Sequence, residues 1–203
     1  MPDSHPHNRR TVAGYENCAR DYATSVPQQP PEPAASAMRR LAELLPPGGR
    51  VLDIGSGPGW DADFLEGLGL RVHRTEATAA FRDFQAERGQ RVDALDLLTD
   101  EIAARYDGIL LQYVLQHFER ADLDGALRKM ADALTDRGAI LLSYPLGEGE
   151  HWDHGASGDY RVVLWSAAAM DERLQGLGLS VVWEAQQDGR DGPWRTLIAR
   201  TAA

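Results

Sequence analysis

The sequence is poor in cysteine and contains no long apolar run. Cys18 is the only cysteine among 203 residues, which excludes internal disulfides and metal sites built from several cysteines. No apolar run approaches the roughly 20 residues that a membrane-spanning helix needs, and residues 1–10 lack the apolar segment of a secretion signal. We therefore expect a cytoplasmic protein with no membrane partner.

Positive charge is scarce as well. Lys and Arg together number 21 against 31 Asp and Glu, the formal net charge is −10, and Lys129 is the only lysine. Binding to nucleic acid depends on Lys and Arg gathered on one face, because they must displace the counterions of many phosphates. Here these residues are spread singly along the chain, so we expect no nucleic-acid partner.

The chain does contain enough apolar material for one large domain, since 43% of its residues are hydrophobic. Residues 1–10 are polar and predict a disordered leader, and residues 15–25 predict one or two helical turns. Four prolines within residues 26–33 predict an extended strap. We expect residues 1–33 to form a flexible leader and N-terminal lid, and residues 34–203 to form the domain.

From residue 50 onward, apolar runs of strand length alternate with helical stretches. Strands are predicted at residues 50–54, 70–75, 91–94, 107–112 and 139–143. Helices are predicted at residues 34–45, 60–68, 78–88, 121–134 and 167–174, with a shorter one near 100–104. The alternation predicts an α/β fold, a Rossmann-like doubly wound sheet of mostly parallel strands. After a predicted loop at 145–159, the runs at 180–185, 186–192 and 194–200 predict an antiparallel C-terminal hairpin at the sheet edge.

The first predicted strand runs directly into a glycine-rich loop. Residues 51–60 read Val-Leu-Asp-Ile-Gly-Ser-Gly-Pro-Gly-Trp. Glycines let the backbone approach a ligand at the carboxyl end of this strand, where open α/β sheets bind small molecules. The simpler interpretation is a tight strand-to-helix turn with no ligand.

Two acids at the ends of the next strands favour a ligand. Glu76 ends the second strand, where a carboxylate can accept hydrogen bonds from the two hydroxyls of a ribose. Asp96 follows the third strand and is placed to accept a hydrogen bond from the amino group of adenine. Each acid alone would also suit a helix cap or a turn. Together with the loop, they predict an adenosine pocket.

With these features the chain resembles the class I S-adenosylmethionine-dependent methyltransferases over roughly residues 15–200. The similar segments are residues 53–59, Glu76, Asp96 and the run from Tyr106 to Phe118. The resemblance implies a seven-stranded sheet whose last strand is antiparallel, with S-adenosylmethionine as cofactor. The cofactor-binding positions that it implies are Tyr15, Tyr22, Asp53, Gly55, Ser56, Gly57, Gly59, Glu76, Ala77, Asp96, Leu97 and Gln112.

The resemblance also gives some of these residues particular roles. The backbone of Gly55–Gly57 would lie under the methionine part of the cofactor, and Asp53 would help to orient its amino group. The segment that holds Tyr15 and Tyr22 is similar to a mobile N-terminal lid, although both rings would also suit plain packing on the sheet. Trp60 departs from the small or polar residues common at its position, and it either packs or walls the pocket.

His117 is our candidate catalytic base. Methyl transfer is an in-line displacement, so the enzyme mainly has to align the nucleophile with the methyl carbon and exclude water. A base is optional, but His117 follows the fourth strand on the cofactor side, and the ordinary pKa of histidine is near neutrality. The alternative is a histidine that caps the short turn.

Residues 148–154 concentrate acids and histidines in one loop. Such side chains could bind a divalent metal, but two histidines three residues apart on a glycine-rich loop are commonly solvent-exposed, so we expect no metal. We expect the region to form the rim of the acceptor site. Arg161 either holds a carboxylate of the acceptor or pairs with surface acids. The expected substrate-binding positions are Tyr113, His151, Trp152, Tyr160 and Arg161.

The segment after the fourth strand narrows the range of possible methyl acceptors. Nucleic-acid and glutamine amino methyltransferases usually carry an Asn/Asp-Pro-Pro-aromatic stretch there, and this chain has Leu111-Gln112-Tyr113-Val114. We expect methylation of an oxygen or nitrogen of a small molecule, as in specialised metabolism, with a protein or carrier-bound acceptor as the alternative. Residues 57–62 also fit a Gly-x-Gly-x-x-Ala dinucleotide pattern, so an NAD(P)-dependent oxidoreductase is a second enzyme class. A protein that binds the cofactor without chemistry is a third possibility.

Overall fold

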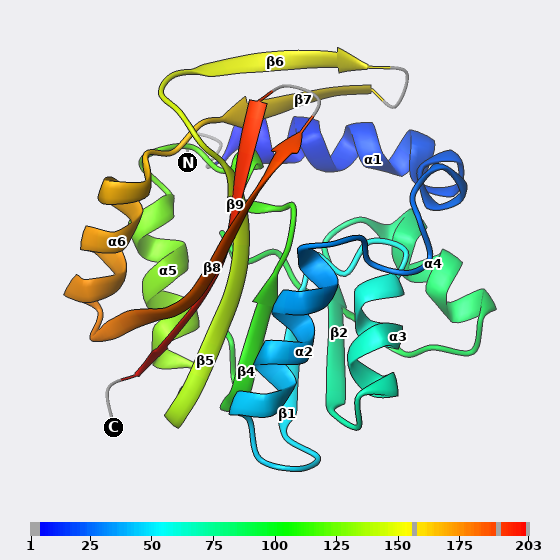
Figure 1. The fold of residues 1–203 in the computed structure, drawn as a ribbon. Coiled ribbons are helices and arrows are strands. Elements are labelled where there is room, and N and C mark those ends of the chain that lie inside the picture. The colour runs from blue at the N-terminus through cyan, green and yellow to red at the C-terminus, as the bar shows by residue number, and fades with distance from the viewer. Residues whose placement is uncertain (1–4, 156–157, 190–191, 202–203) are drawn as a thin grey trace.

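The computed structural model describes residues 5–155, 158–189 and 192–201 (Figure 1). Within these residues one sheet has seven strands in the order β3-β2-β1-β4-β5-β9-β8. Neighbouring strands among β1 to β5 are parallel, and β9 is antiparallel to both β5 and β8. This confirms the predicted fold. The strands are β1 (Arg50–Ile54), β2 (Arg71–Glu76), β3 (Val92–Ala94), β4 (Tyr106–Leu111), β5 (Leu134–Pro145), β8 (Leu179–Gly189) and β9 (Gly192–Thr201).

Helices cover both faces of this sheet (Figure 1). Because side chains alternate between the faces of a strand, Leu110 of β4 joins the core cluster that contains Leu41 and Leu65. Its neighbour Leu111 joins the other cluster, which contains Leu127 and Leu174. The helices that make these layers are α2 (Ala34–Leu44), α3 (Trp60–Gly67), α4 (Ala79–Glu87), α5 (Leu123–Asp132) and α6 (Ala167–Gly176), with a short 3-10 turn, η1 (Leu115–His117).

A long N-terminal helix, α1 (Pro6–Ser25), crosses the end of the sheet where the parallel strands finish (Figure 1). The predicted disordered leader is therefore wrong from Pro6 on, and the helix is much longer than the one or two turns predicted. Residues 1–4 lie outside the described residues. Polar contacts with distant parts of the chain hold this segment: Asn8 donates to Asp96 at 2.7 Å, and His5 Nδ1 lies 3.1 Å from the Asp122 carboxylate.

A two-stranded hairpin, β6 (Glu150–Gly155) and β7 (Gly158–Val163), lies over α1 (Figure 1). The predicted loop at residues 145–159 is therefore wrong over much of its length. The hairpin lacks the alternating apolar residues by which strands are recognised, and polar cross-strand contacts take their place. The Tyr160 hydroxyl donates to Asp153 at 2.6 Å, and Arg161 donates to Glu150 at 2.6 Å.

The predicted short helix near residues 100–104 is also wrong, because that segment is irregular. Backbone carbonyls that would otherwise need helical partners bind a side chain. The Lys129 ammonium donates to the carbonyl of Leu97 at 3.1 Å and to that of Asp100 at 2.8 Å. The only lysine of the chain thus fastens the segment after β3 to α5.

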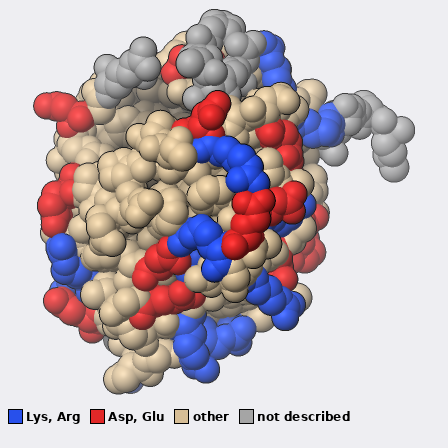
Figure 2. All heavy atoms as spheres, turned by 90° about the vertical axis from the view of Figure 1, so that its right-hand side faces the viewer, with Lys and Arg blue, Asp and Glu red and all other residues tan. Residues whose placement is uncertain are grey.

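The face formed by α3 and α4 mixes both signs of charge. Figure 2 shows Lys and Arg side chains lying beside Asp and Glu, as in the ion pairs Arg20–Glu87 and Arg88–Asp63. Such a face does not present the gathered positive charge that binding to phosphates requires. Among the described residues, no helix is both long enough and apolar enough to span a membrane.

Candidate active site

A cavity of about 370 Å³ lies between α1 and the carboxyl ends of the parallel strands. It is centred where β1 and β4 are neighbours, the point at which the strand order reverses and where open α/β sheets bind ligands. Most of the expected cofactor-binding positions lie in its wall. Those that line it are Tyr15, Tyr22, Gly55, Ser56, Gly57, Glu76, Ala77, Asp96, Leu97 and Gln112.

The glycine-rich loop shapes one side of this cavity. Gly55, Gly57 and Gly59 all have positive φ, at 69°, 51° and 87°. A Cβ at Gly55 would lie 2.6 Å from the Val114 side chain, so packing requires that glycine. A Cβ at Gly57 would meet nothing within 4 Å. Gly57 therefore borders open space in which a ligand can approach the backbone.

Two buried side chains that sequence reasoning missed support the loop from behind. Gln85 of α4 donates to Ser56 Oγ at 2.6 Å and to the Gly57 carbonyl at 2.9 Å. Arg74 of β2, which is only 2% exposed, donates to the Gly59 carbonyl at 3.2 Å and to Asp63 at 2.8 Å. Both residues look like ordinary surface positions in the sequence. Their tertiary contacts fix the conformation of the loop.

Glu76 joins the loop to the end of β2. One carboxylate oxygen accepts from the Gly57 N–H at 2.8 Å and the other from the Thr78 N–H at 2.8 Å. Burial raises the pKa of Glu76, and these two N–H groups oppose that rise by stabilising the charged form. A carboxylate has about four acceptor positions, so two remain for a ligand.

Asp96 acts as a turn residue and also lines the cavity. One oxygen accepts from the Leu98 N–H at 3.0 Å, as a turn residue would, and the other accepts from Asn8 of α1 at 2.7 Å. The residue also lines the cavity next to Leu97.

Gln112 and Asp53 are buried polar side chains without full partners. Gln112 is 6% exposed and lines the cavity, and neither its amide nitrogen nor its amide oxygen has a hydrogen-bond partner in the described structure. Asp53 is 3% exposed, and its Oδ2 has no partner among the described residues. Burial raises the pKa of Asp53 well above its usual range. Asp53 is not part of the cavity wall, and neither is Gly59, so both lie behind the surface that a ligand would touch.

His117 lies at the end of η1 in the cavity wall. Its Nδ1 is 2.9 Å from the Arg161 carbonyl, which can only accept, so Nδ1 carries the proton and Nε2 carries the lone pair. Nε2 accepts from the Gln116 amide at 3.1 Å and faces the Tyr15 hydroxyl at 3.3 Å. Burial lowers the pKa of His117 to about 4, so the imidazole is neutral at pH 7 and is a weaker base than the near-neutral pKa expected from the sequence.

Aromatic rings from α1 and β7 enclose His117. The Tyr15 ring packs on Tyr22, Phe81 and His117 at centroid distances of 5.7, 5.9 and 5.7 Å. The Tyr160 ring lies edge-on to His117 at 5.5 Å. The two tyrosines of the predicted lid thus both pack against neighbours and line the cavity.

Of the expected substrate positions, the structure places only Tyr113 in the cavity wall. Tyr113 has a positive φ of 56°, which is unusual for a side chain of its size, and its N–H donates to Ser143 Oγ at 2.9 Å. Arg161 instead pairs with Glu150 at 2.6 Å and Glu119 at 3.5 Å, the acid pairing that was the alternative. The expected positions that do not line the cavity are His151, Trp152, Tyr160 and Arg161.

Charge in the cavity wall is of one sign. The described lining residues include the acids Asp61, Glu76 and Asp96 and no Lys or Arg. In the part of the chain that the structure describes, no group of three or more His, Cys, Asp or Glu side chains is arranged to hold a metal ion.

Helix α1 is fastened over the cavity by a carboxylate. Glu16 accepts from the backbone N–H groups of Ala79 at 2.6 Å and Ala80 at 2.9 Å, which are unpaired donors in the first turn of α4. The negative charge also lies at the positive end of that helix. Glu16 therefore holds α1 against the N-terminus of α4 and caps that helix at the same time.

We expect Glu16→Ala to loosen α1. Loss of two charge-assisted hydrogen bonds, worth about 1–2 kcal/mol here, should speed amide exchange in residues 8–24 by roughly 5- to 30-fold, as measured by mass spectrometry. The matched control is Asn17→Ala, because the one side-chain hydrogen bond of Asn17 to a described residue lies within α1, to the Ala13 carbonyl. Faster exchange in α4 alone would mean that Glu16 caps that helix without holding α1.

A seven-stranded sheet of this order, with a glycine-lined cavity at its switch point and acids ending β2 and β3, defines the class I methyltransferase fold. Residues 28–184 match the family described as a methyltransferase domain. The chain belongs to this methyltransferase family. The predicted resemblance is thereby confirmed, and the enzyme class is a methyltransferase rather than an oxidoreductase.

Several known proteins are similar to this chain. The protein-L-isoaspartate O-methyltransferase of Chlorobium limicola is 34% identical over 146 residues, and the match covers 68% of this chain and 62% of that protein's length. The 1,6-didemethyltoxoflavin-N1-methyltransferase of Burkholderia thailandensis, solved with 1,6-didemethyltoxoflavin and S-adenosylhomocysteine, is similar with a TM-score of 0.71 at 20% identity, covering 100% of this chain and 93% of that one. The CcbJ methyltransferase of Streptomyces caelestis has a TM-score of 0.73 at 15% identity, covering 95% and 98%.

Proposed function

We propose that this protein transfers a methyl group from S-adenosylmethionine to an oxygen or nitrogen of a small molecule whose reacting part carries no negative charge. The observation that carries the proposal is the cavity at the switch point, with its exposed Gly57 backbone, its acids and its lack of positive side chains among the described lining residues.

The residues present fit this cofactor. Glu76 has acceptor positions left for ribose hydroxyls, Asp96 lines the cavity and would accept from an adenine amino group, and Gln112 has an amide with no partner in the described structure. When bound, the cofactor supplies a methyl group on a positively charged sulfur, and acids in the wall favour a positive ligand.

His117 then serves as the base for the acceptor. Its neutral imidazole keeps a lone pair on Nε2, and the Arg161 carbonyl fixes that tautomer. The proton that the acceptor loses goes to Nε2 once the Gln116 amide, which donates to that nitrogen, has turned away. It reaches Nε2 either after the Tyr15 hydroxyl moves aside or through that hydroxyl. The apolar rings around His117 exclude water from the reaction.

The negative charge of the cavity wall favours a methyl acceptor that carries no negative charge. A carboxylate acceptor would meet Asp61, Glu76 and Asp96 without a compensating cation, because Arg161 is already paired with acids. The solved relative from Burkholderia thailandensis holds a small molecule, which supports an acceptor of that size. The isoaspartate-directed relative supports a second candidate, a protein acceptor.

The test is methyl transfer from deuterium-labelled S-adenosylmethionine to a panel of neutral phenols, amines and nitrogen heterocycles, with carboxylic acids and an isoaspartyl peptide as the contrasting set. We expect labelled products only from the neutral group, detected by liquid chromatography and mass spectrometry. Labelled isoaspartyl peptide alone would establish the protein acceptor instead. Absence of binding to both S-adenosylmethionine and S-adenosylhomocysteine would overturn the proposal.

A further inference from the structure

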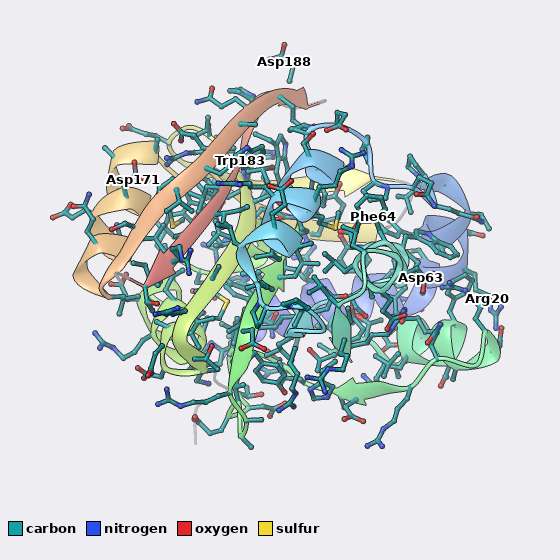
Figure 3. The ribbon with its side chains drawn as sticks, turned by 60° about the horizontal axis from the view of Figure 1, so that its bottom comes forward. Arg20, Asp63, Phe64, Asp171, Trp183 and Asp188 are labelled. Atoms are coloured by element: carbon teal, nitrogen blue, oxygen red, sulfur yellow. The ribbon has the colours of Figure 1, made fainter. Side chains whose placement is uncertain are left out.

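Asp61, the second residue of α3, is an acid in the cavity wall and in the first turn of its helix. Its carboxylate makes no hydrogen bond or ion pair with any described residue, although it lines the cavity. Asp63, two residues further along, differs sharply, because it pairs with Arg74 and Arg88. Figure 3 shows Asp63 on the side of α3 that faces α4.

The groups that face Asp61 are acidic or neutral. They are Asp53 of β1, Tyr22 of α1 and Tyr113 after β4, each of which interacts with it electrostatically. Glu76 of β2 adds a further acid to the same wall. Burial raises the pKa of Asp61 to about 6, and no described cation offsets that cost. A buried carboxylate in a cavity wall without a paired cation marks a candidate functional site.

Gln112 gives an independent indication of a ligand at the same place. Its amide is 6% exposed, lines the cavity and is unpartnered at both atoms in the described structure. β4, which Gln112 follows, is paired with β1, and β1 leads through the glycine-rich loop into Asp61. An acceptor and a donor on one amide suit a group that carries both an ammonium and a carboxylate.

We propose that Asp61 binds the α-ammonium at the amino acid end of S-adenosylmethionine, with the Gln112 amide contacting the same end. The inference rests on the proposed cofactor and assigns a residue that the sequence did not indicate. Asp53, which the resemblance linked to this amino group, lies behind the cavity wall. Asp61 is the acid that reaches the ligand.

The experiment compares two ligands by isothermal titration calorimetry. S-adenosylhomocysteine carries the amino acid end, whereas 5′-methylthioadenosine keeps the nucleoside and the sulfur and lacks that end. Asp61→Asn should weaken S-adenosylhomocysteine by about 10- to 100-fold and change the affinity for 5′-methylthioadenosine by less than about twofold. Asp63→Asn is the matched control and should change both affinities alike.

The affinity ratio of the two ligands should also depend on pH. Since Asp61 must be charged to bind an ammonium, the preference of the wild type for S-adenosylhomocysteine should rise as pH increases from about 5 to about 7.5. Glu76 affects both ligands through the ribose and so cancels in the ratio. Asp53 is the other acid beside Asp61, and loss of the pH dependence in Asp61→Asn would assign the effect to Asp61.

A third measurement separates binding from structure. An acid whose pKa is raised by folding opposes folding above that pKa, so Asp61→Asn should raise the melting temperature of the ligand-free protein by a few degrees at pH 8. If Asp61 were merely structural, the Asp61→Asn substitution would lower both the stability of the protein and its affinity for the ligands. An unchanged ligand ratio in Asp61→Asn overturns the inference while leaving the proposed cofactor intact. Failure of the wild type to bind either ligand would overturn the proposed function instead.

Discussion

His117→Ala should lower kcat by about 100-fold or more while changing the dissociation constant of S-adenosylhomocysteine by less than about threefold. The expected loss follows from the Nε2 lone pair, which the Arg161 carbonyl orients and which no other described side chain in the cavity wall duplicates as a neutral base. The assay is steady-state methyl transfer to the best acceptor from the panel.

The matched variant is His117→Gln, which keeps a hydrogen-bonding side chain but cannot take a proton. Retention of most of the turnover in this variant would contradict the role of a base. Tyr15→Phe completes the set, because the Tyr15 hydroxyl faces Nε2 at 3.3 Å. A loss similar to that of His117→Ala would show that the hydroxyl passes the proton, and an unchanged rate would show that it moves aside.

The pH profile gives a separate check on His117. Because burial lowers the pKa of His117 to about 4, its imidazole stays neutral between about pH 6 and pH 8. We therefore expect no change in kcat/KM from this residue over that range, since kcat/KM reports ionisation in the free enzyme. The folded pKa of His117 lies below its unfolded value, so its contribution to stability is lost as pH falls from about 6.5 towards 4. An NMR titration that placed this pKa near 6.5 would contradict the buried environment.

The central part of the fold could be predicted because local signals and tertiary structure agree there. The first strand was expected at residues 50–54 and is β1, and the helix expected at 60–68 is α3 at Trp60–Gly67. An apolar strand, three glycines and a helical stretch leave few other conformations. The acids Glu76 and Asp96 followed from the same regular alternation.

Helix α1 and the β6–β7 hairpin could not be predicted in the same way, because their stability comes from polar contacts with residues distant in the sequence. Nothing within residues 6–25 shows that Glu16 will cap α4 or that Asn8 will meet Asp96. Likewise, the hairpin depends on the pairing of Arg161 with Glu150, and this pairing removes the arginine from the acceptor site. Asp61 carries no sequence signal at all, since its importance follows from the lack of a partner in the folded chain.

Glu76→Ala should weaken S-adenosylhomocysteine and 5′-methylthioadenosine alike, by about 10- to 100-fold, or roughly 1.5–3 kcal/mol. Both ligands carry the ribose, and Glu76 is expected to accept hydrogen bonds from its hydroxyls. This variant should therefore differ from Asp61→Asn, which affects only S-adenosylhomocysteine. Asp93→Ala is the matched control, because that acid lies in the middle of the neighbouring strand β3 and pairs with His73 outside the cavity. Isothermal titration calorimetry would measure both affinities.

The same substitution should also change stability, and the sign is informative. Alanine leaves the Gly57 and Thr78 N–H groups without their acceptor, which costs about 1–3 kcal/mol for each buried donor. Against this, it removes a carboxylate whose pKa burial has raised and whose charge therefore opposes folding at neutral pH. The donors number two and the charge is already stabilised by them, so we expect a net loss of stability in denaturant unfolding. A variant that became more stable while losing ligand affinity would show that Glu76 serves the ligand and does not hold the loop; unchanged affinity with lower stability would show the reverse.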